Sequence, residues 1–249
     1  MSMCRWLIAA VIVLVMLPNA FGQQSPEVGR VKLAGFGDLL REHNIELTKP
    51  SLLLALRNPN ADVRFLAAMK LAEDKEVDAI PAIKKALTVE KVPRDRVNMA
   101  VALGLLGDQA GRDELRKVCA DNNIIPEFRL YAVRYMLDLH AQEGDCLGAA
   151  EEIADSKDAK PGDRTSSLQL LPQFQNTTSV ESQKILEIML HCLEDPEPIV
   201  RMAASDALAS LGDASAAPYI EAAMAREQEE GTRLTFQRDL RKLQQSTKK

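Results

Sequence analysis

Apolar side chains follow a helical period from about residue 50 to residue 243, in register with an arginine that recurs six times. The arginines are separated by 32, 33, 35, 37 and 32 residues, and the residue seven places after each one is large and apolar. Offsets of three, seven and ten residues from the arginine lie on one stripe of an α-helix. The arginines are Arg64, Arg96, Arg129, Arg164, Arg201 and Arg233, and the apolar column is Leu71, Leu103, Met136, Leu171, Leu208 and Leu240. The pattern predicts six copies of one buried helix.

An acidic or amide residue precedes each arginine by six positions. This spacing places the acid or amide in the turn after a first helix, and the arginine in the first turn of a second helix. Stacked copies can then form a ladder of charge-assisted hydrogen bonds. We expect this ladder to be structural, without a binding or catalytic role. Its predicted members are Asn58, Arg64, Glu90, Arg96, Asn123, Arg129, Asp158, Arg164, Asp195 and Arg201.

Prolines and glycines mark the ends of these predicted helices. Three first helices begin with Pro50, Pro81 and Pro218, where the missing amide hydrogen costs nothing. The exit Leu106-Gly107-Asp108 recurs as Leu211-Gly212-Asp213, and glycine is expected where a helix ends in a left-handed turn. The fourth copy is irregular, because Pro172 should break its second helix. We expect a kink or a mobile joint there.

Taken together, these features resemble the HEAT-repeat family, particularly the short bacterial type. They are an Asp or Asn in the inter-helix turn, an Arg six residues later, alanines along the second helix, and the Leu-Gly-Asp exit. The copies that fit best are Asn58-Pro59-Asn60-Ala61-Asp62-Val63-Arg64 and Asp195-Pro196-Glu197-Pro198-Ile199-Val200-Arg201. The resemblance implies an all-α fold, a right-handed α-solenoid (alpha-alpha superhelix) of about six two-helix repeats over residues 48–243. Each repeat of such a fold is stabilised by its neighbours.

In the HEAT family the second helices line a concave surface, and the resemblance places function there. The rows that face outward should fall five and nine residues after each arginine. Apolar residues cluster at the amino-terminal end of these rows, as Met69, Val101 and Leu105, beside the charged Arg134 and Asp138. We expect these five residues to form a docking site for a protein or peptide. The competing interpretation is that the three apolar residues pack between adjacent second helices.

The first 22 residues have the pattern of a secretory signal peptide. Arg5 precedes an apolar run at residues 6–17, and small residues occupy positions 20 and 22. Twelve apolar residues fall short of the roughly 20 that span a bilayer, so we predict cleavage before Gln23 and no stable membrane insertion. The product is expected to be exported, either periplasmic or secreted. We interpret residues 23–47 as an N-terminal extension or cap and residues 244–249 as a disordered tail.

Charge and cysteine content narrow the partner classes. The formal net charge is −5, and an acidic chain is poorly suited to the phosphate backbone of a nucleic acid. The exported chain keeps Cys119, Cys146 and Cys192. The first two should lie at opposite ends of neighbouring, similarly directed first helices, too far apart for a disulfide. We therefore predict free thiols.

Catalytic chemistry is not indicated by the remaining polar residues. His43, His140 and His191 are about one to three repeats apart, too scattered to share a metal. The HEAT-like deoxyhypusine hydroxylases bind iron through His-Glu pairs, and no His here precedes a Glu. We expect His191-Cys192 to pack or face solvent rather than to act as a nucleophile. We predict an exported scaffold or adaptor that binds a protein or peptide, with no cofactor and no enzymatic activity. The alternative is an enzyme accessory or a lyase-like HEAT-repeat protein, as in the phycobilin lyases, which act on cytoplasmic pigment proteins.

Overall fold

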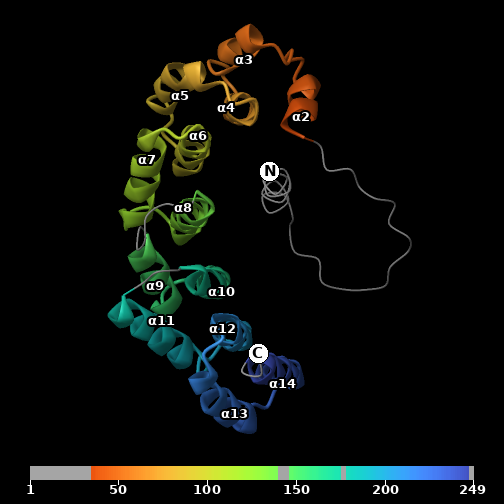
Figure 1. Cartoon of the computed structure of the whole chain (residues 1–249), viewed down its shortest axis with the longest axis vertical. Helices are drawn as coiled ribbons and strands as arrows, with labels where there is room; N and C mark the ends of the chain where they lie inside the picture. Colours follow the sequence, from red (N-terminus) through yellow and green to blue (C-terminus); the bar gives the residue numbers. More distant parts are fainter. Residues whose placement is uncertain (1–34, 140–145, 175–177, 247–249) are drawn as a thin grey trace, which may run out of the picture. The chain divides into compact units, whose positions relative to one another are not determined.

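The computed structural model describes residues 35–139, 146–174 and 178–246, and within these ranges the regular structure is entirely helical (Figure 1). The α-helices are α2 (Phe36–Glu42), α3 (Lys49–Ala55), α4 (Ala61–Glu73), α5 (Ile80–Leu87), α6 (Pro93–Leu105), α7 (Gln109–Ala120), α8 (Pro126–Asp138), α9 (Leu147–Asp155), α10 (Pro161–Leu170), α11 (Ser179–Cys192), α12 (Pro198–Leu211), α13 (Ala217–Arg226) and α14 (Glu230–Ser246). Short 3-10 turns cover Val77–Ala79, Leu171–Gln173 and Ala214–Ala216. The predicted all-α class is confirmed.

Twelve of these helices form the six predicted pairs. An odd-numbered first helix precedes an even-numbered second helix in each pair, from α3 and α4 to α13 and α14. Each recurring arginine is the fourth residue of its even-numbered helix, so it lies in the first turn as predicted. Proline opens α6, α8, α10 and α12, where its fixed backbone angle suits the start of a helix. The predicted solenoid of two-helix repeats is confirmed.

The chain divides into two compact units at residues 86 and 87. In the first unit, α2 and α3 both pack against α4. The rings of Phe36 in α2 and Phe65 in α4 meet edge to face, with centroids 6.2 Å apart. Phe36 is buried, as is Leu71 of the apolar column. The predicted cap therefore contains one short helix that covers part of the apolar surface of α4.

The second unit consists of two helical layers (Figure 1). The even-numbered helices α6, α8, α10, α12 and α14 form one layer, and each contacts the next. The odd-numbered helices α7, α9, α11 and α13 form the other layer. The side chains of the apolar column are buried in the second unit. Leu103, Met136, Leu171 and Leu208 are at most 2% exposed, so the predicted core position is confirmed in the second unit.

Glycine serves two purposes in the turns of the second unit. Gly107 and Gly212 follow α6 and α12 with φ angles of 81° and 76°, the left-handed conformation predicted for these exits. Gly111 in α7 instead permits close packing, since a Cβ atom there would lie 2.6 Å from the backbone nitrogen of Gly104 in α6. The helices α6 and α7 can approach this closely only because residue 111 has no side chain.

Two predicted boundaries meet different outcomes. Helix α10 ends at Leu170 and continues as a 3-10 turn that contains Pro172, so the predicted break is confirmed. The predicted tail at residues 244–249 starts too early, because α14 continues to Ser246. No proline interrupts this helix, its one glycine, Gly231, lies in the first turn, and Leu243 is still buried. The predicted signal peptide, His140, and residues 175–177 and 247–249 lie outside the described residues.

Candidate functional site

Five of the recurring arginines bind a backbone carbonyl at the end of the first helix of their own repeat or in the turn that follows it. Arg64, Arg96 and Arg201 donate to the backbone carbonyl oxygens of Asn58, Glu90 and Asp195, over 2.8, 3.0 and 2.8 Å. Arg129 and Arg164 reach the carbonyl oxygens of Cys119 and Ala154, at 2.9 and 3.1 Å. The last carbonyls of a helix have no partner within the helix, so a guanidinium satisfies them well. In three repeats the predicted pair is thus joined through the main chain, whereas Arg129 and Arg164 bind residues other than the predicted Asn123 and Asp158.

Side-chain ion pairs then link one repeat to the next. Arg164 pairs with Asp195 at 2.5 Å, and Arg201 pairs with Glu227 at 2.7 Å. Asp195 and Glu227 are the residues six places before Arg201 and Arg233, so each binds the arginine of the repeat before its own. Arg96 and Arg129 instead form ion pairs with Glu114 in α7 and Glu152 in α9, respectively.

The other predicted ladder positions have different surroundings. The Asn58 side chain accepts a hydrogen bond from the backbone amide of Asn60. Asn123 donates to Asp121 at 2.9 Å from both its backbone and its side chain. Asp158 is exposed. The carboxylate or amide of these residues therefore lies in turn structure rather than at the centre of an inter-repeat pair.

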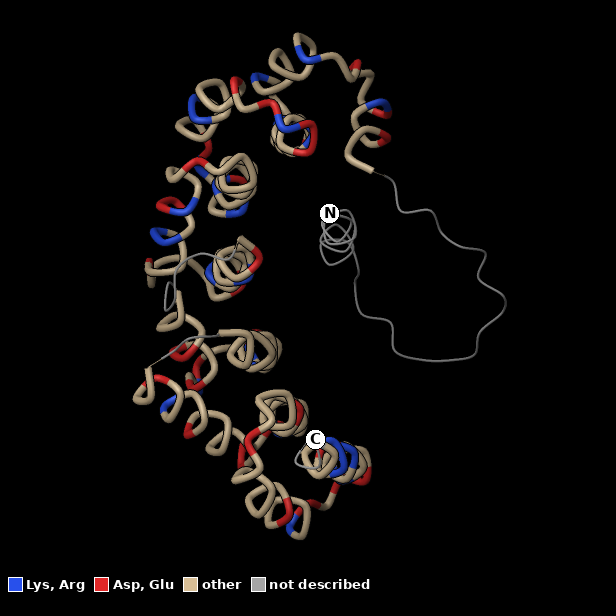
Figure 2. The backbone as a smooth tube through the Cα atoms, viewed as in Figure 1, with Lys and Arg blue, Asp and Glu red and all other residues tan. Residues whose placement is uncertain are grey.

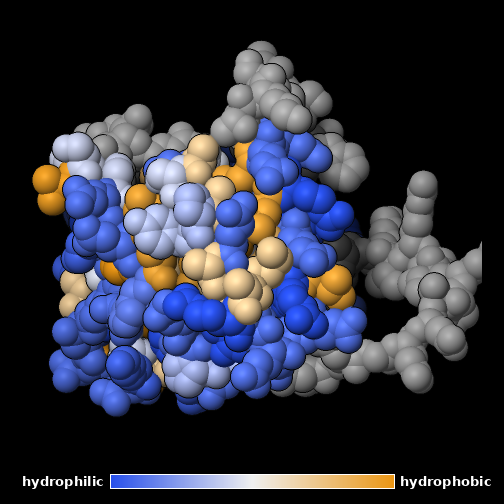
Figure 3. Space-filling model, turned by 90° about the horizontal axis from the view of Figure 1, so that it is seen from below, coloured by the Kyte–Doolittle hydropathy of each residue, from blue (hydrophilic) through white to orange (hydrophobic). Residues whose placement is uncertain are grey.

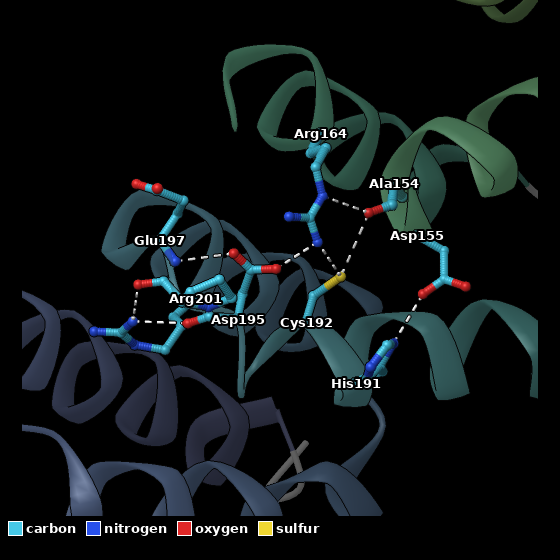
Figure 4. A network of polar contacts seen from close by, with 9 residues as sticks. Ala154, Asp155, Arg164, His191, Cys192, Asp195, Glu197 and Arg201 are labelled. Carbon is cyan, nitrogen blue, oxygen red and sulfur yellow. Dashed lines mark hydrogen bonds and ion pairs between the residues drawn. The ribbon is translucent and has the colours of Figure 1, made fainter. Parts of the chain in front are cut away.

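Arg164 forms the most deeply buried of these links (Figure 4). Its side chain is 7% exposed and that of Asp195 is 5% exposed. Burial acts to lower the pKa of Arg164, but the Asp195 carboxylate raises it above the ordinary arginine value. The Sγ atom of Cys192 lies 4.0 Å from the same guanidinium. The contacts join α9, α10, α11 and the turn that precedes α12.

The side chains of His191 and Cys192 contact different residues (Figure 4). The Nδ1 atom of His191 lies 2.8 Å from Asp155, an acidic partner that sequence reasoning missed because it is 36 residues away. The Cys192 thiol lies 3.6 Å from the carbonyl oxygen of Ala154. Burial raises the pKa of Cys192 to about 11, so the thiol stays protonated near neutral pH. The nucleophilic form of cysteine is the thiolate, and this surrounding disfavours it.

The prediction that all thiols are free is wrong for Cys119 and Cys146, which form a disulfide with their Cα atoms 5.7 Å apart. The prediction assumed that α7 and α9 start at the same level. Cys146 comes directly before α9, yet its sulfur lies 3.9 Å from the carbonyl oxygen of Leu115 in α7. The start of α9 therefore lies beside the last turns of α7, where Cys119 is located. Cys192 remains a free, buried thiol.

A hollow of about 550 Å³ borders this disulfide. It lies between the end of α7, the start of α8 and the first turns of α9. Besides both cysteines, its polar lining comprises Arg116, Asn122, Arg129 and Glu152. Arg129 and Glu152 face each other in a bidentate pair with distances of 2.9 and 3.3 Å.

The five predicted docking residues differ in their exposure to solvent. Met69, in the first unit, is 5% exposed and Val101 in α6 is 3% exposed, so these two cannot offer surface to a partner. Both side chains are packed against other helices, as the competing interpretation expects of apolar residues. Leu105 is 43% exposed at the end of α6. Arg134 is partly exposed and Asp138 is exposed, both in the neighbouring helix α8.

An aromatic pair in α8 extends this surface. Phe128 and Tyr131 are stacked with ring centroids 6.4 Å apart, and both are partly exposed. Burial raises the pKa of Tyr131, nearby Glu127 raises it further, and nearby Arg94 in α6 lowers it. Sequence reasoning missed the pair because Tyr131 lies two residues after its arginine, outside the two rows considered. We define the α6–α8 surface as Arg94, Leu105, Phe128, Tyr131 and Arg134.

The same layer is polar at the other end of the second unit. Arg238 in α14 bonds Asp206 in α12 at 3.1 Å, and Lys242 bonds Ser210 at 2.9 Å. These are the predicted outward rows, brought into register across two repeats. Figure 2 shows Lys and Arg gathered on α14, and Figure 3, which looks onto the α13–α14 end, shows apolar patches among a mainly hydrophilic surface. Leu234 in α14 is 56% exposed on this terminal pair.

The described ranges also bear on membrane insertion and metal binding. No helix there is long and apolar enough to cross a membrane. Across the same residues, no three His, Cys, Asp or Glu side chains gather where they could hold a metal ion.

Comparison with known families defines the class of protein. The model of the HEAT repeats matches residues 50–137 and 150–241, and the chain belongs to the HEAT-repeat family. It is therefore a helical repeat protein whose second helices form a continuous layer in the unit that carries α6 to α14. No curated protein sequence matches it.

Several solved structures are similar to the chain at low identity. An engineered protein is 17% identical with a TM-score of 0.44, over 78% of this chain and 96% of that one. The complex of CpcE and CpcF of phycocyanin lyase from Nostoc sp. PCC7120 is 16% identical with a TM-score of 0.36, over 89% and 100%. Human deoxyhypusine hydroxylase in complex with glycerol is 16% identical with a TM-score of 0.29, over 79% and 84%. At these scores the likeness does not extend to a function.

Proposed function

We propose that this protein is an exported, non-catalytic scaffold that binds a protein or peptide through the α6–α8 surface. The observation that carries the proposal is the stacked, partly exposed pair Phe128 and Tyr131 in α8, with Arg94 of the neighbouring second helix α6 near Tyr131 and the exposed Leu105 at the end of α6. Tyrosine and arginine are enriched among the residues that dominate binding energy at protein interfaces. The proposal drops the buried Met69 and Val101 from the predicted docking site and keeps Leu105 and Arg134.

The chemistry of this surface fits a chain segment with an apolar anchor. Leu105 offers aliphatic area, and Tyr131 offers an aromatic body with a polar tip. The partly exposed guanidiniums of Arg94, which also pairs with Asp95 at 3.0 Å, and of Arg134 can bind carbonyl or carboxylate groups of a partner. The corresponding rows of α12 and α14 pair their polar side chains with one another across the two repeats. Binding is therefore proposed for α6 and α8 alone.

The disulfide supports the proposal of export. Disulfides form and persist in oxidising compartments and are rare in the cytosol. The Cys119–Cys146 bond joins two repeats of the folded chain, so it fits a protein that matures outside the cytosol. The signal-like pattern at residues 1–22 points to the same compartment.

Selection of peptides on the mature chain tests the proposal. A displayed peptide library would be panned on the chain that starts at Gln23, and the affinities of the selected peptides would be measured. Leu105→Asp should weaken these peptides at least about tenfold, because a charge replaces an apolar contact. Tyr131→Ala should weaken them similarly, and circular dichroism checks that each variant remains folded.

The matched control is Leu234→Asp, which places the same charge at a leucine of α14 that is 56% exposed. Its affinities should equal those of the unchanged chain. Peptides that bind Leu105→Asp as tightly as the unchanged chain, or that lose equal affinity with Leu234→Asp, would refute the proposed surface.

A further inference from the structure

The two sulfurs of the Cys119–Cys146 disulfide have unequal surroundings. Cys119 lies in the last turn of α7 and is 3% exposed, whereas Cys146 is partly exposed. Cys146 is the N-cap residue of α9, with a left-handed φ of 67° that is uncommon for a residue with a side chain. The hollow of about 550 Å³ borders both residues. An external reagent can therefore approach the bond from the side of Cys146.

The surroundings of Cys146 favour a negative charge on its sulfur once the bond is broken. The first turn of α9 contains no acidic residue, and the Cys146 side chain makes no capping hydrogen bond in the disulfide. The amide groups at a helix N-terminus, together with its dipole, stabilise an anion. Two guanidiniums, those of Arg116 and Arg129, also line the hollow. Each is paired with a carboxylate, so the helix terminus supplies the larger effect.

We propose that Cys119–Cys146 is an exchangeable disulfide that reacts with an external dithiol, with Cys146 as the sulfur that is attacked. A thiolate of the dithiol bonds to the Sγ atom of Cys146, the disulfide breaks, and its electron pair passes to Cys119, which takes up a proton. The second thiolate of the dithiol then attacks the dithiol sulfur that is bonded to Cys146. This closes the dithiol into a disulfide and releases Cys146 as a thiolate. Two electrons reach this chain, Cys119 gains one proton, Cys146 is left as a thiolate, and the dithiol becomes a disulfide.

The position of the bond links this exchange to the proposed binding surface. The disulfide joins residues 27 positions apart, and the loop that it closes contains the whole of α8. Phe128, Tyr131 and Arg134 lie on that helix. Reduction removes a covalent constraint on α8, so we expect it to weaken peptide binding at the α6–α8 surface. This last step rests on the proposed function, whereas the exchange itself does not.

The third thiol does not compete in the exchange. Cys192 is 1% exposed, and burial raises its pKa to about 11. It contacts Arg164 and Ala154 rather than either member of the disulfide. Cys192 therefore serves as an internal control that reacts only when the fold opens.

The test is reduction of the folded mature chain. The protein would be treated with dithiothreitol near pH 7.5, freed of the reagent and alkylated in the folded state, and the labelled cysteines would be identified by mass spectrometry. Cys146 should become labelled while the buried Cys119 and Cys192 stay unlabelled and the helical circular dichroism is retained. Labelling of all three cysteines together, with loss of the helical signal, would overturn the proposal.

A second measurement uses the Cys119→Ser variant, in which Cys146 is a free thiol. Its alkylation rate should fall less than about tenfold from pH 8 to pH 6, whereas an ordinary cysteine slows by roughly two orders of magnitude. The variant should also form a mixed disulfide with oxidised glutathione, while Cys146→Ser should not, because Cys119 is buried. An ordinary pH dependence at Cys146 would contradict the proposed activation. If Cys119→Ser does not fold, the same rates would be read on the reduced unchanged chain.

The two parts of the inference fail separately. Exchange without any change in peptide affinity would refute the link to the α6–α8 surface and leave the exchange standing. A chain that selects no peptide would refute the proposed function, while the alkylation pattern would still decide the exchange.

Discussion

Truncation of Arg164 tests how much one buried inter-repeat ion pair contributes to the fold. Its guanidinium and the Asp195 carboxylate are 2.5 Å apart, and the two side chains are only 7% and 5% exposed. In Arg164→Ala the Asp195 charge would remain buried without its partner, and the carbonyl oxygen of Ala154 would lose a hydrogen bond. Breaking a buried pair by removing one partner costs about 3–5 kcal/mol. We expect the free energy of unfolding to fall by about 4 kcal/mol.

The matched control is Arg226→Ala, which removes another Arg–carboxylate pair between neighbouring repeats. Arg226 and Glu194 are 2.7 Å apart, but both side chains are more than 60% exposed. Exposed pairs contribute about 0–1 kcal/mol, so the control should barely change stability. Urea unfolding followed by circular dichroism measures both variants. Equal losses in the two variants would show that burial does not set the strength of these links.

A double-mutant cycle isolates the charge effect. Asp195→Asn keeps an oxygen that can accept the hydrogen bond from the backbone amide of Glu197, but it removes the buried charge. The combined Arg164→Ala and Asp195→Asn variant should therefore be less destabilised than the sum of the two single variants. Strictly additive losses would refute the claim that the stranded carboxylate is the main cost.

Three further perturbations follow from the same structure. Replacing Cys119 and Cys146 by alanine removes a cross-link between residues 27 apart, and chain entropy predicts a loss of about 3.5 kcal/mol in urea unfolding. Gly111→Ala places a Cβ atom 2.6 Å from the backbone of α6 and should cost about 1–3 kcal/mol, whereas Gly148→Ala, with open space around it, should be neutral or slightly stabilising. Burial raises the pKa of Asp239 in the folded state above its unfolded value. The protonated carboxyl is therefore compatible with the fold at low pH, and stability is lost as the pH rises through the folded-state pKa, because ionisation of the buried group opposes folding. Asp239→Asn should therefore raise the melting temperature at pH 7, and the gain should shrink as the pH falls below about 4, where Asp239 is protonated in both states. A gain that stays the same at acid pH would contradict the role of ionisation.

The sequence by itself determined the repeat and its core. An apolar residue seven places after each arginine could be assigned to a buried stripe because helical periodicity is a local property of the chain. Leu103 and Leu208, more than a hundred residues apart, are both fully buried for this reason. The left-handed exits at Gly107 and Gly212 and the helix break before Pro172 were equally predictable, since backbone restrictions act within a few residues.

Only the tertiary structure decided which side chains meet across repeats. The stagger of α9 against α7 brings Cys146 to Cys119, the packing of α9 and α11 brings Asp155 to His191, and close packing buries Val101. These outcomes depend on how far one helix slides along another, and interlocking side chains from several repeats set that distance. A period read from one chain fixes the face of a helix but leaves its axial position free, so the partners of the arginines and cysteines could not be derived from spacing alone.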